Sequence, residues 1–161
     1  MKILGIDPGL ASTGWAILYQ DKTPALLARG CFTTDKKIPL SSRLLAISRE
    51  INRLTKLYRP SVLAVEEIFF ARNTKTAITI AQCLGVIKMT AAQLRLAVAG
   101  FTPLNIKMAM TGYGRADKKQ VEFMLHKCLN LTTKIKPHHA ADAAAVALTY
   151  LFTNQHLTIH S

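Results

Sequence analysis

Apolar residues along this chain of 161 residues fall into short runs and longer periodic stretches. Three short runs, at residues 2–7, 14–20 and 25–34, are bounded by turn-forming residues, which is typical of β-strands. Because the connections between them are short, these runs predict an antiparallel meander. A fourth run at 62–65 is apolar at every position, as expected for a strand that is covered on both faces.

The longer stretches repeat apolar residues with the period of a helix. After Pro39, a stripe with helical spacing predicts a helix over 39–57; its members are Leu40, Leu44, Ile47, Ile51, Leu54 and Leu57. A second helix is predicted over 74–99 and is apolar on more than one side, which indicates contact with the sheet and with a second surface. We interpret this second surface as a homodimer interface, with burial inside the core as the alternative.

The C-terminal third carries shorter signals. We predict a short strand (101–104), a helical turn (105–110), a glycine-bearing link (111–116), a helix capped by Asp117 (118–128), and a last helix (138–152). The last helix is dense in alanine, and such small side chains allow it to lie close to a sheet. The order of elements predicts an α/β fold, a mixed five-stranded sheet flanked by helices. We expect one domain over residues 1–152 and a frayed tail over 153–161.

The chain is strongly basic, with a formal net charge of +12 and a pI near 10.0. Residues 1–71 hold 10 Lys and Arg against 6 acids, and residues 72–161 hold 11 against 3. An excess of this size favours nucleic acid as the partner, with an anionic membrane surface as the second choice. The chain shows neither a basic amphipathic helix nor a long apolar run, so we expect no membrane contact. Three widely spaced cysteines without a CxxC motif indicate reduced thiols and a cytoplasmic location.

Three acids stand at the ends of apolar elements. Asp7 ends the first predicted strand, Glu66 ends the fourth, and Asp142 lies in the first turns of the last helix, three residues after His139. If the first and fourth strands are neighbours, their carboxyl ends meet where open α/β sheets place ligands. The last helix can bring His139 and Asp142, which share one helical face, to the same point.

Crowded carboxylates repel one another unless cations bind between them. Oxygen-rich sites suit Mg²⁺ or Mn²⁺, and two such ions about 3.5–4 Å apart can hold the attacking and leaving oxygens of a phosphodiester. Each residue also has a purely structural explanation. Asp7 can cap a turn, Asp142 can interact with the helix dipole, and His139 can lack a special role.

Three segments resemble the motifs of RuvC-type Holliday junction resolvases. The first is GIDPGLASTG at residues 5–14, the second is VEEIFFARN at 65–73, and the third is HHAADAAAVA at 138–147. Their order and spacing fit the family over about residues 2–152. The resemblance implies an RNase H-like fold and a homodimer through the 74–99 helix.

The same resemblance implies an Mg²⁺-dependent endonuclease that makes paired nicks in four-way DNA junctions during recombination and repair, leaving 5′-phosphate and 3′-hydroxyl ends. It assigns the catalytic and metal-binding positions to Asp7, Glu66, His139 and Asp142, with two Mg²⁺ per subunit and Mn²⁺ as a substitute. Many members carry Asp where this chain has His139, and a histidine must be neutral to bind a metal. The branch-migration proteins RuvA and RuvB are the expected partners.

Several residues are expected to contact DNA. The resemblance places Phe69 beside the bases at the strand exchange point, where an aromatic ring can stack on an unpaired base; packing within the protein is the alternative. Basic residues predicted to contact phosphates are Arg72, Lys75, Lys107, Arg115, Lys118 and Lys119.

Two other classes share some of these features. ATPases of the actin and sugar-kinase kind begin with a similar strand and DxG turn, but they need two such domains around a cleft. A non-catalytic DNA-binding protein explains the charge, but it leaves three acids at apolar termini unexplained, because acids repel phosphate without a metal. Replacing Asp7 by Asn separates a nuclease from a binding protein.

Overall fold

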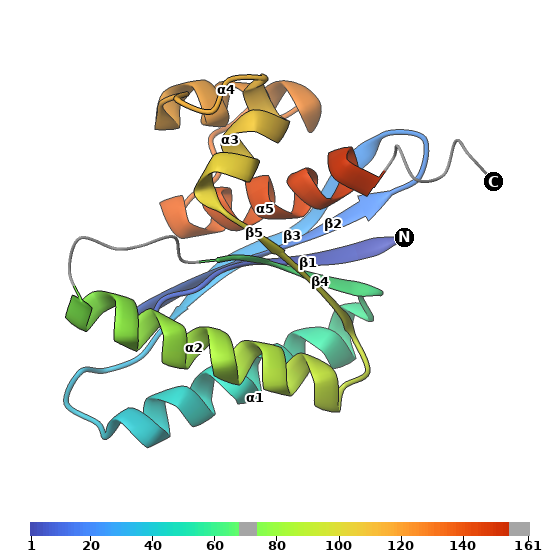
Figure 1. Cartoon of the computed structure of the whole chain (residues 1–161). Coiled ribbons are helices and arrows are strands. Elements are labelled where there is room, and N and C mark those ends of the chain that lie inside the picture. The colour runs from blue at the N-terminus through green and yellow to red at the C-terminus, as the bar shows by residue number, and fades with distance from the viewer. Residues whose placement is uncertain (68–73, 155–161) are drawn as a thin grey trace.

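In the computed structural model, which describes residues 1–67 and 74–154, one five-stranded sheet is covered by helices on both faces (Figure 1). The strands are β1 (Lys2–Asp7), β2 (Ser12–Gln20), β3 (Pro24–Thr33), β4 (Val62–Glu66) and β5 (Ala97–Phe101). The helices are α1 (Leu40–Tyr58), α2 (Thr74–Gln93), α3 (Pro103–Thr111), α4 (Lys118–Cys128) and α5 (His138–Asn154). Within the described part of the chain, we find no helix with the length and hydrophobicity of a membrane span.

The strand order is β3-β2-β1-β4-β5. Antiparallel pairing joins β1 to β2 and β2 to β3, whereas β4 runs parallel to both β1 and β5. The predicted meander and the mixed five-stranded α/β sheet are therefore confirmed. Because Ile6 of β1 is paired with Val65 of β4, the carboxyl ends of these two strands lie side by side.

Helices α1 and α2 cover one face of the sheet, and α5 covers the other, with α3 and α4 outside it (Figure 1). On the α1 and α2 face, the core consists of large aliphatic side chains such as Ile47, Ile51 and Leu54, which are fully buried against β1, β2 and β4. On the other face, α5 contributes a run of buried alanines that follows the predicted pattern.

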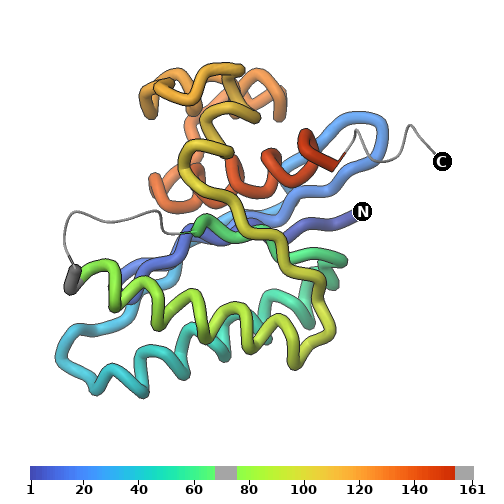
Figure 2. The backbone as a smooth tube through the Cα atoms, viewed as in Figure 1, coloured from blue at the N-terminus to red at the C-terminus, as the bar shows by residue number. Residues whose placement is uncertain are grey.

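The alanine-rich helix α5 lies unusually close to the sheet. A Cβ at Gly5 would collide with the backbone carbonyl of Ala143, and a Cβ at Gly14 would collide with the carbonyl of His139. These two positions therefore require glycine because the backbones of helix and strand approach each other there. Figure 2 shows how this contact brings the C-terminal helix over strands from the start of the chain.

Several predicted boundaries in the second half of the chain are wrong. The helix predicted over 74–99 ends at Gln93, where Arg95 adopts a positive φ of 57° and the Leu96 amide donates to the carbonyl of Ala91. This left-handed residue closes the helix, and the apolar residues that follow it form β5. The strand predicted over 101–104 therefore lies at Ala97–Phe101.

The predicted helical turn at 105–110 is a full helix, α3, which begins with Pro103. Thr102 caps it in a reciprocal arrangement with Asn105, so Thr-Pro was a helix-start signal and not the continuation of a strand. The cap predicted at Asp117 is confirmed, because its side chain accepts from the amide of Gln120. The last helix continues two residues beyond the predicted end at 152.

Candidate active site

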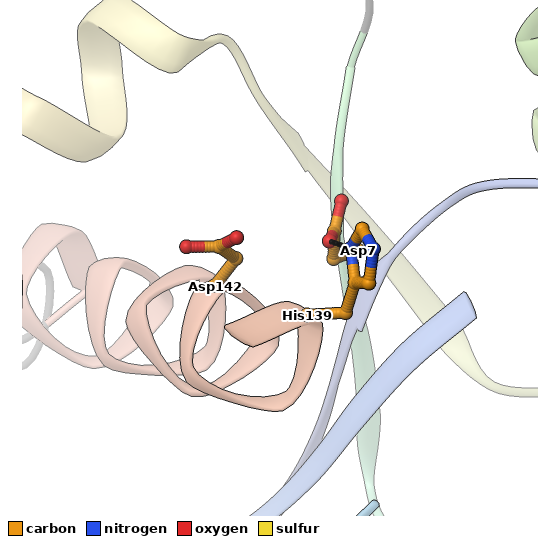
Figure 3. Close-up of side chains that lie close together, drawn as sticks. All are labelled: Asp7, His139 and Asp142. Carbon is orange, nitrogen blue, oxygen red and sulfur yellow. Dashed lines mark hydrogen bonds and ion pairs between the residues drawn. The ribbon is translucent and has the colours of Figure 1, made fainter. Parts of the chain in front are cut away.

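The carboxyl ends of β1 and β4 place Asp7 and Glu66 at one edge of the sheet. Helix α5 begins at the same edge and adds His139 and Asp142, which lie on one face because they are three residues apart. Figure 3 shows Asp7, His139 and Asp142 together, with the imidazole and the Asp7 carboxylate in contact.

His139 and Asp7 form the tightest contact of the site. The distance between Nδ1 of His139 and Oδ2 of Asp7 is 2.7 Å, and the side chains are 49% and 16% exposed. The position of His139 depends on Gly14, because any side chain at residue 14 would displace the carbonyl of His139. The glycine in the first motif therefore sets the position of a residue in the last motif.

One metal-binding atom from each of Asp7, His139 and Asp142 lies within 4.8 Å of the other two. This spacing suits a shared cation, and the donor set of carboxylate oxygens and an imidazole suits Mg²⁺ or Mn²⁺. Glu66 is not part of this group of three, but it borders the group and lines a groove together with Asp142. Of the four residues predicted to form one site, Asp7, His139 and Asp142 therefore lie together, and Glu66 lies at the border of the group.

The electrostatics of the site favour an added cation. Burial raises the pKa of Glu66 to about 7, and repulsion by Asp7 and Asp142 adds to the effect. Burial also raises the pKa of Asp7, although the hydrogen bond from His139 acts in the opposite direction. A divalent cation between these groups would remove the repulsion and favour the ionised forms.

Lys118 supplies the positive charge that contacts this cluster. Its ammonium group lies 2.7 Å from Oδ2 of Asp142, and its charge offsets a small part of the rise in the pKa of Glu66 and Asp7. Sequence reasoning assigned Lys118 to DNA and did not predict the ion pair, because nothing in the local sequence shows that the start of α4 faces α5.

Two grooves are lined in part by the residues of this site. The first has a volume of about 280 Å³ and contains Glu66, Asp142, Lys107 and Lys118. The second has a volume of about 650 Å³ and contains Asp7 and His139. Its walls include Arg43. The sequence did not point to this residue, because it lies in none of the three motifs.

The other predicted DNA contacts are more scattered. Lys119 lines a third groove, together with Lys118 and His138. Arg115 is exposed between α3 and α4. Phe69 and Arg72 lie outside the described residues, as does the side chain of Lys75. Glu67, which strand alternation assigns to the opposite face, pairs with Lys88 of α2 at 2.6 Å.

Comparison with known proteins identifies the family. The family model for crossover junction endodeoxyribonuclease RuvC matches residues 3–150. The RuvC of Syntrophomonas wolfei is 46% identical over 152 residues, which are 94% of this chain and 88% of that protein. The RuvC of Finegoldia magna is 44% identical over 153 residues, which are 94% and 93% of the two chains.

Solved structures agree with the sequence matches. Thermus thermophilus RuvC is 31% identical and superimposes with a TM-score of 0.91, covering 98% of each chain. The same protein in complex with a Holliday junction substrate gives a TM-score of 0.93, covering 98% of this chain and 97% of that one. The yeast mitochondrial Holliday junction resolvase Ydc2, at 14% identity and a TM-score of 0.71, shares the fold. The fold is RNase H-like, and the chain belongs to the RuvC family of crossover junction endodeoxyribonucleases.

Proposed function

We propose that this protein is a metal-dependent endonuclease that resolves four-way DNA junctions by paired nicks, leaving 5′-phosphate and 3′-hydroxyl ends, in recombination and repair. The observation that carries the proposal is the meeting of Asp7, His139 and Asp142 within 4.8 Å beside Glu66. Relatives at 44–46% identity are named crossover junction endodeoxyribonucleases, and the similar Thermus thermophilus protein binds a Holliday junction substrate.

The four side chains Asp7, Glu66, His139 and Asp142 would hold two Mg²⁺ per subunit, with Mn²⁺ as a substitute. When bound, the ions supply positive charge for the attacking and leaving oxygens of the phosphodiester. The donor set fits this role because burial, together with repulsion by Asp7 and Asp142, raises the pKa of Glu66 to about 7, and a bound cation would favour its ionised form.

The remaining chemistry depends on how the chain orients these groups. When Asp7 is ionised and His139 is neutral, Nδ1 of His139 carries the proton and donates to Oδ2, which leaves Nε2 as the nitrogen with a free lone pair. Lys118 neutralises part of the charge of Asp142. Since it also lines the groove that contains Glu66, its ammonium group is placed to bind a substrate phosphate once Asp142 has another partner.

The basic surface binds the junction arms through their phosphates. The grooves at or beside the acids are lined by Lys107, Lys118 and Lys119. Further phosphate contacts are proposed for Arg115, Arg72 and Lys75. Affinity should therefore fall steeply with salt. Phe69 would stack on a base near the strand exchange point, which gives shape recognition an aromatic contact.

A homodimer would match the two-fold symmetry of a four-way junction. We assign its interface to α2, where Ile78 and Met89 are 56% and 53% exposed although the helix is apolar overall. Sedimentation at micromolar concentration that shows only monomer would contradict this assignment. RuvA and RuvB are the proposed partners, and the cytoplasm is the proposed location, where the three free cysteines would stay reduced.

Cleavage of a synthetic four-way junction tests the proposal, with linear duplex of the same sequence as the control substrate. The wild-type protein should cut the junction only when Mg²⁺ or Mn²⁺ is present, and it should leave the duplex intact. Asp7→Asn should bind the junction as tightly as the wild type and fail to cut it. Cutting by Asp7→Asn at the wild-type rate would contradict the assigned site, and binding without cutting by the wild type would favour a non-catalytic DNA-binding protein.

A further inference from the structure

The groove on the Asp7 side of the acids is built from three separate parts of the chain. The turn after β1, from Pro8 to Ser12, forms one wall, and the first turns of α2 form another with the side chains of Thr76 and Thr79. Arg43 of α1 completes the lining. The groove has a volume of about 650 Å³ and opens directly onto Asp7 and His139.

Arg43 is the one Lys or Arg among the described residues of this groove. Its Nε donates to Oγ1 of Thr34 at 2.8 Å, and Oγ1 of Thr34 donates in turn to the carbonyl of Leu10. These two bonds fix the guanidinium to the turn that follows Asp7. The arginine therefore keeps a defined position relative to the acids.

The two terminal amino groups of the guanidinium are available as hydrogen-bond donors. Over residues 1–67 and 74–154, no carboxylate lies within 4.0 Å of Arg43, and its Nε is the one side-chain nitrogen with a hydrogen bond. A partly buried arginine without an acidic partner, whose two terminal amino groups are unused, matches the geometry of a phosphate oxygen pair. The hydroxyl group of Thr76 offers a neutral donor in the same groove.

The acids have cations on both sides. Lys107 and Lys118 lie in the groove with Glu66 and Asp142, and Arg43 lies in the groove with Asp7 and His139. A DNA strand whose phosphate is cut at the acids must continue in both directions. We propose that Arg43 binds the phosphate next to the cut phosphate on the same strand, and that it thereby positions the strand for cleavage.

This proposal rests on the proposed nuclease function, and its test separates the two. Cleavage rates are measured under single-turnover conditions for the wild type, Arg43→Ala, Arg43→Lys and Arg49→Ala. Arg49 is a matched control, because it is an exposed arginine of the same helix that does not line the groove. Thermal unfolding of each variant shows whether the protein is folded under the assay conditions.

Arg43→Ala should slow cleavage about tenfold or more, since a hydrogen bond to a charged group is lost. Arg43→Lys should recover part of the rate, because it keeps the charge but loses the bond to Thr34. Arg49→Ala should stay within about twofold of the wild type.

The second arm replaces single phosphates of the cut strand by neutral methylphosphonates, one on either side of the cut. One of these two substitutions should slow the wild type about tenfold and have no further effect on Arg43→Ala. If Arg43 had only a structural role, the rate losses from Arg43→Ala and from the methylphosphonate would multiply at both phosphate positions. That result would overturn the proposal. Equal rates for Arg43→Ala and the wild type would also overturn it while leaving the nuclease function intact, whereas a wild type that cuts no junction would refute both.

Discussion

The two faces of the sheet are packed by opposite means. On the α1 and α2 face, fully buried side chains such as Ile47 and Ile51 fill the space between helix and strand. On the α5 face, the backbones approach so closely that Gly5 and Gly14 have no room for a Cβ. The difference teaches that the first face mainly holds the fold together, whereas the second also sets the position of His139 and Asp142. Removing volume from the first should affect stability, and adding volume to the second should affect the site.

Gly14→Ala should lower the cleavage rate and the stability together. The new Cβ would collide with the carbonyl of His139 and push the start of α5 away from β2. We expect the junction cleavage rate to fall about 100-fold or more, because misplacement of reacting groups by about 1 Å has effects of this size. Stability should fall by about 1–3 kcal/mol, as for other overpacked sites. Single-turnover cleavage and urea unfolding measure the two losses, and an unchanged cleavage rate would show that α5 need not lie this close.

Ile51→Ala tests the other face. Ile51 is fully buried between α1 and the sheet, and its truncation leaves a cavity. The free energy of unfolding should fall by about 2–5 kcal/mol. The fraction that remains folded should bind Mn²⁺ as tightly as the wild type, because the cavity lies on the face away from α5. A Mn²⁺ affinity that falls together with stability would contradict the division between the two faces.

Glu66→Gln tests whether the carboxylate of Glu66, which the site requires, lowers the stability of the metal-free protein. Burial, together with repulsion by Asp7 and Asp142, raises the pKa of Glu66 from 4.5 to about 7. Between these pH values the folded protein binds more protons than the unfolded chain, so the metal-free protein loses stability as the pH rises, and the loss is complete above about pH 7.

The variant has no such group, so in a chelating buffer at about pH 8 it should be more stable than the wild type by up to about 3 kcal/mol. The difference should become small at about pH 4, where Glu66 is mostly protonated in both states. Urea unfolding across this range measures the effect, and parallel pH profiles for the two proteins would contradict it. Cleavage should be lost in the variant at every pH.

The smallest effect is expected for Gly85→Ala. It is the same substitution as Gly14→Ala, but it lies at a position with free space around it. Among the described residues, a Cβ at this exposed position of α2 would meet nothing within 4 Å apart from the backbone of its own helix. Alanine favours a helix over glycine by about 0.5–1 kcal/mol, so the variant should unfold at a slightly higher temperature. A lower unfolding temperature that depends on protein concentration would instead place Gly85 within the homodimer interface.

The sequence predicted the site better than it predicted the element boundaries. Asp7 and Glu66 were recognisable because an acid at the end of an apolar strand is costly without a partner. The periodicity of a helix then placed His139 and Asp142 on one face. Their role in catalysis stays a prediction, as does the domain boundary at residue 152.

The remaining features depend on contacts between distant segments. The end of α2 was missed because apolar residues continue through Leu94 into β5, and a single residue with positive φ, Arg95, decides the boundary. The ion pair of Lys118 with Asp142 and the position of Arg43 beside Asp7 follow from the packing of α4 and α1. No local pattern reports such packing.

The most direct test of the account is X-ray diffraction from crystals soaked in Mn²⁺, because the anomalous signal of manganese locates the ion without assumptions about its ligands. We expect anomalous density between Asp7, His139 and Asp142, beside Glu66, and its loss in Asp7→Asn. An empty cluster at a Mn²⁺ concentration that supports junction cleavage in solution would contradict it.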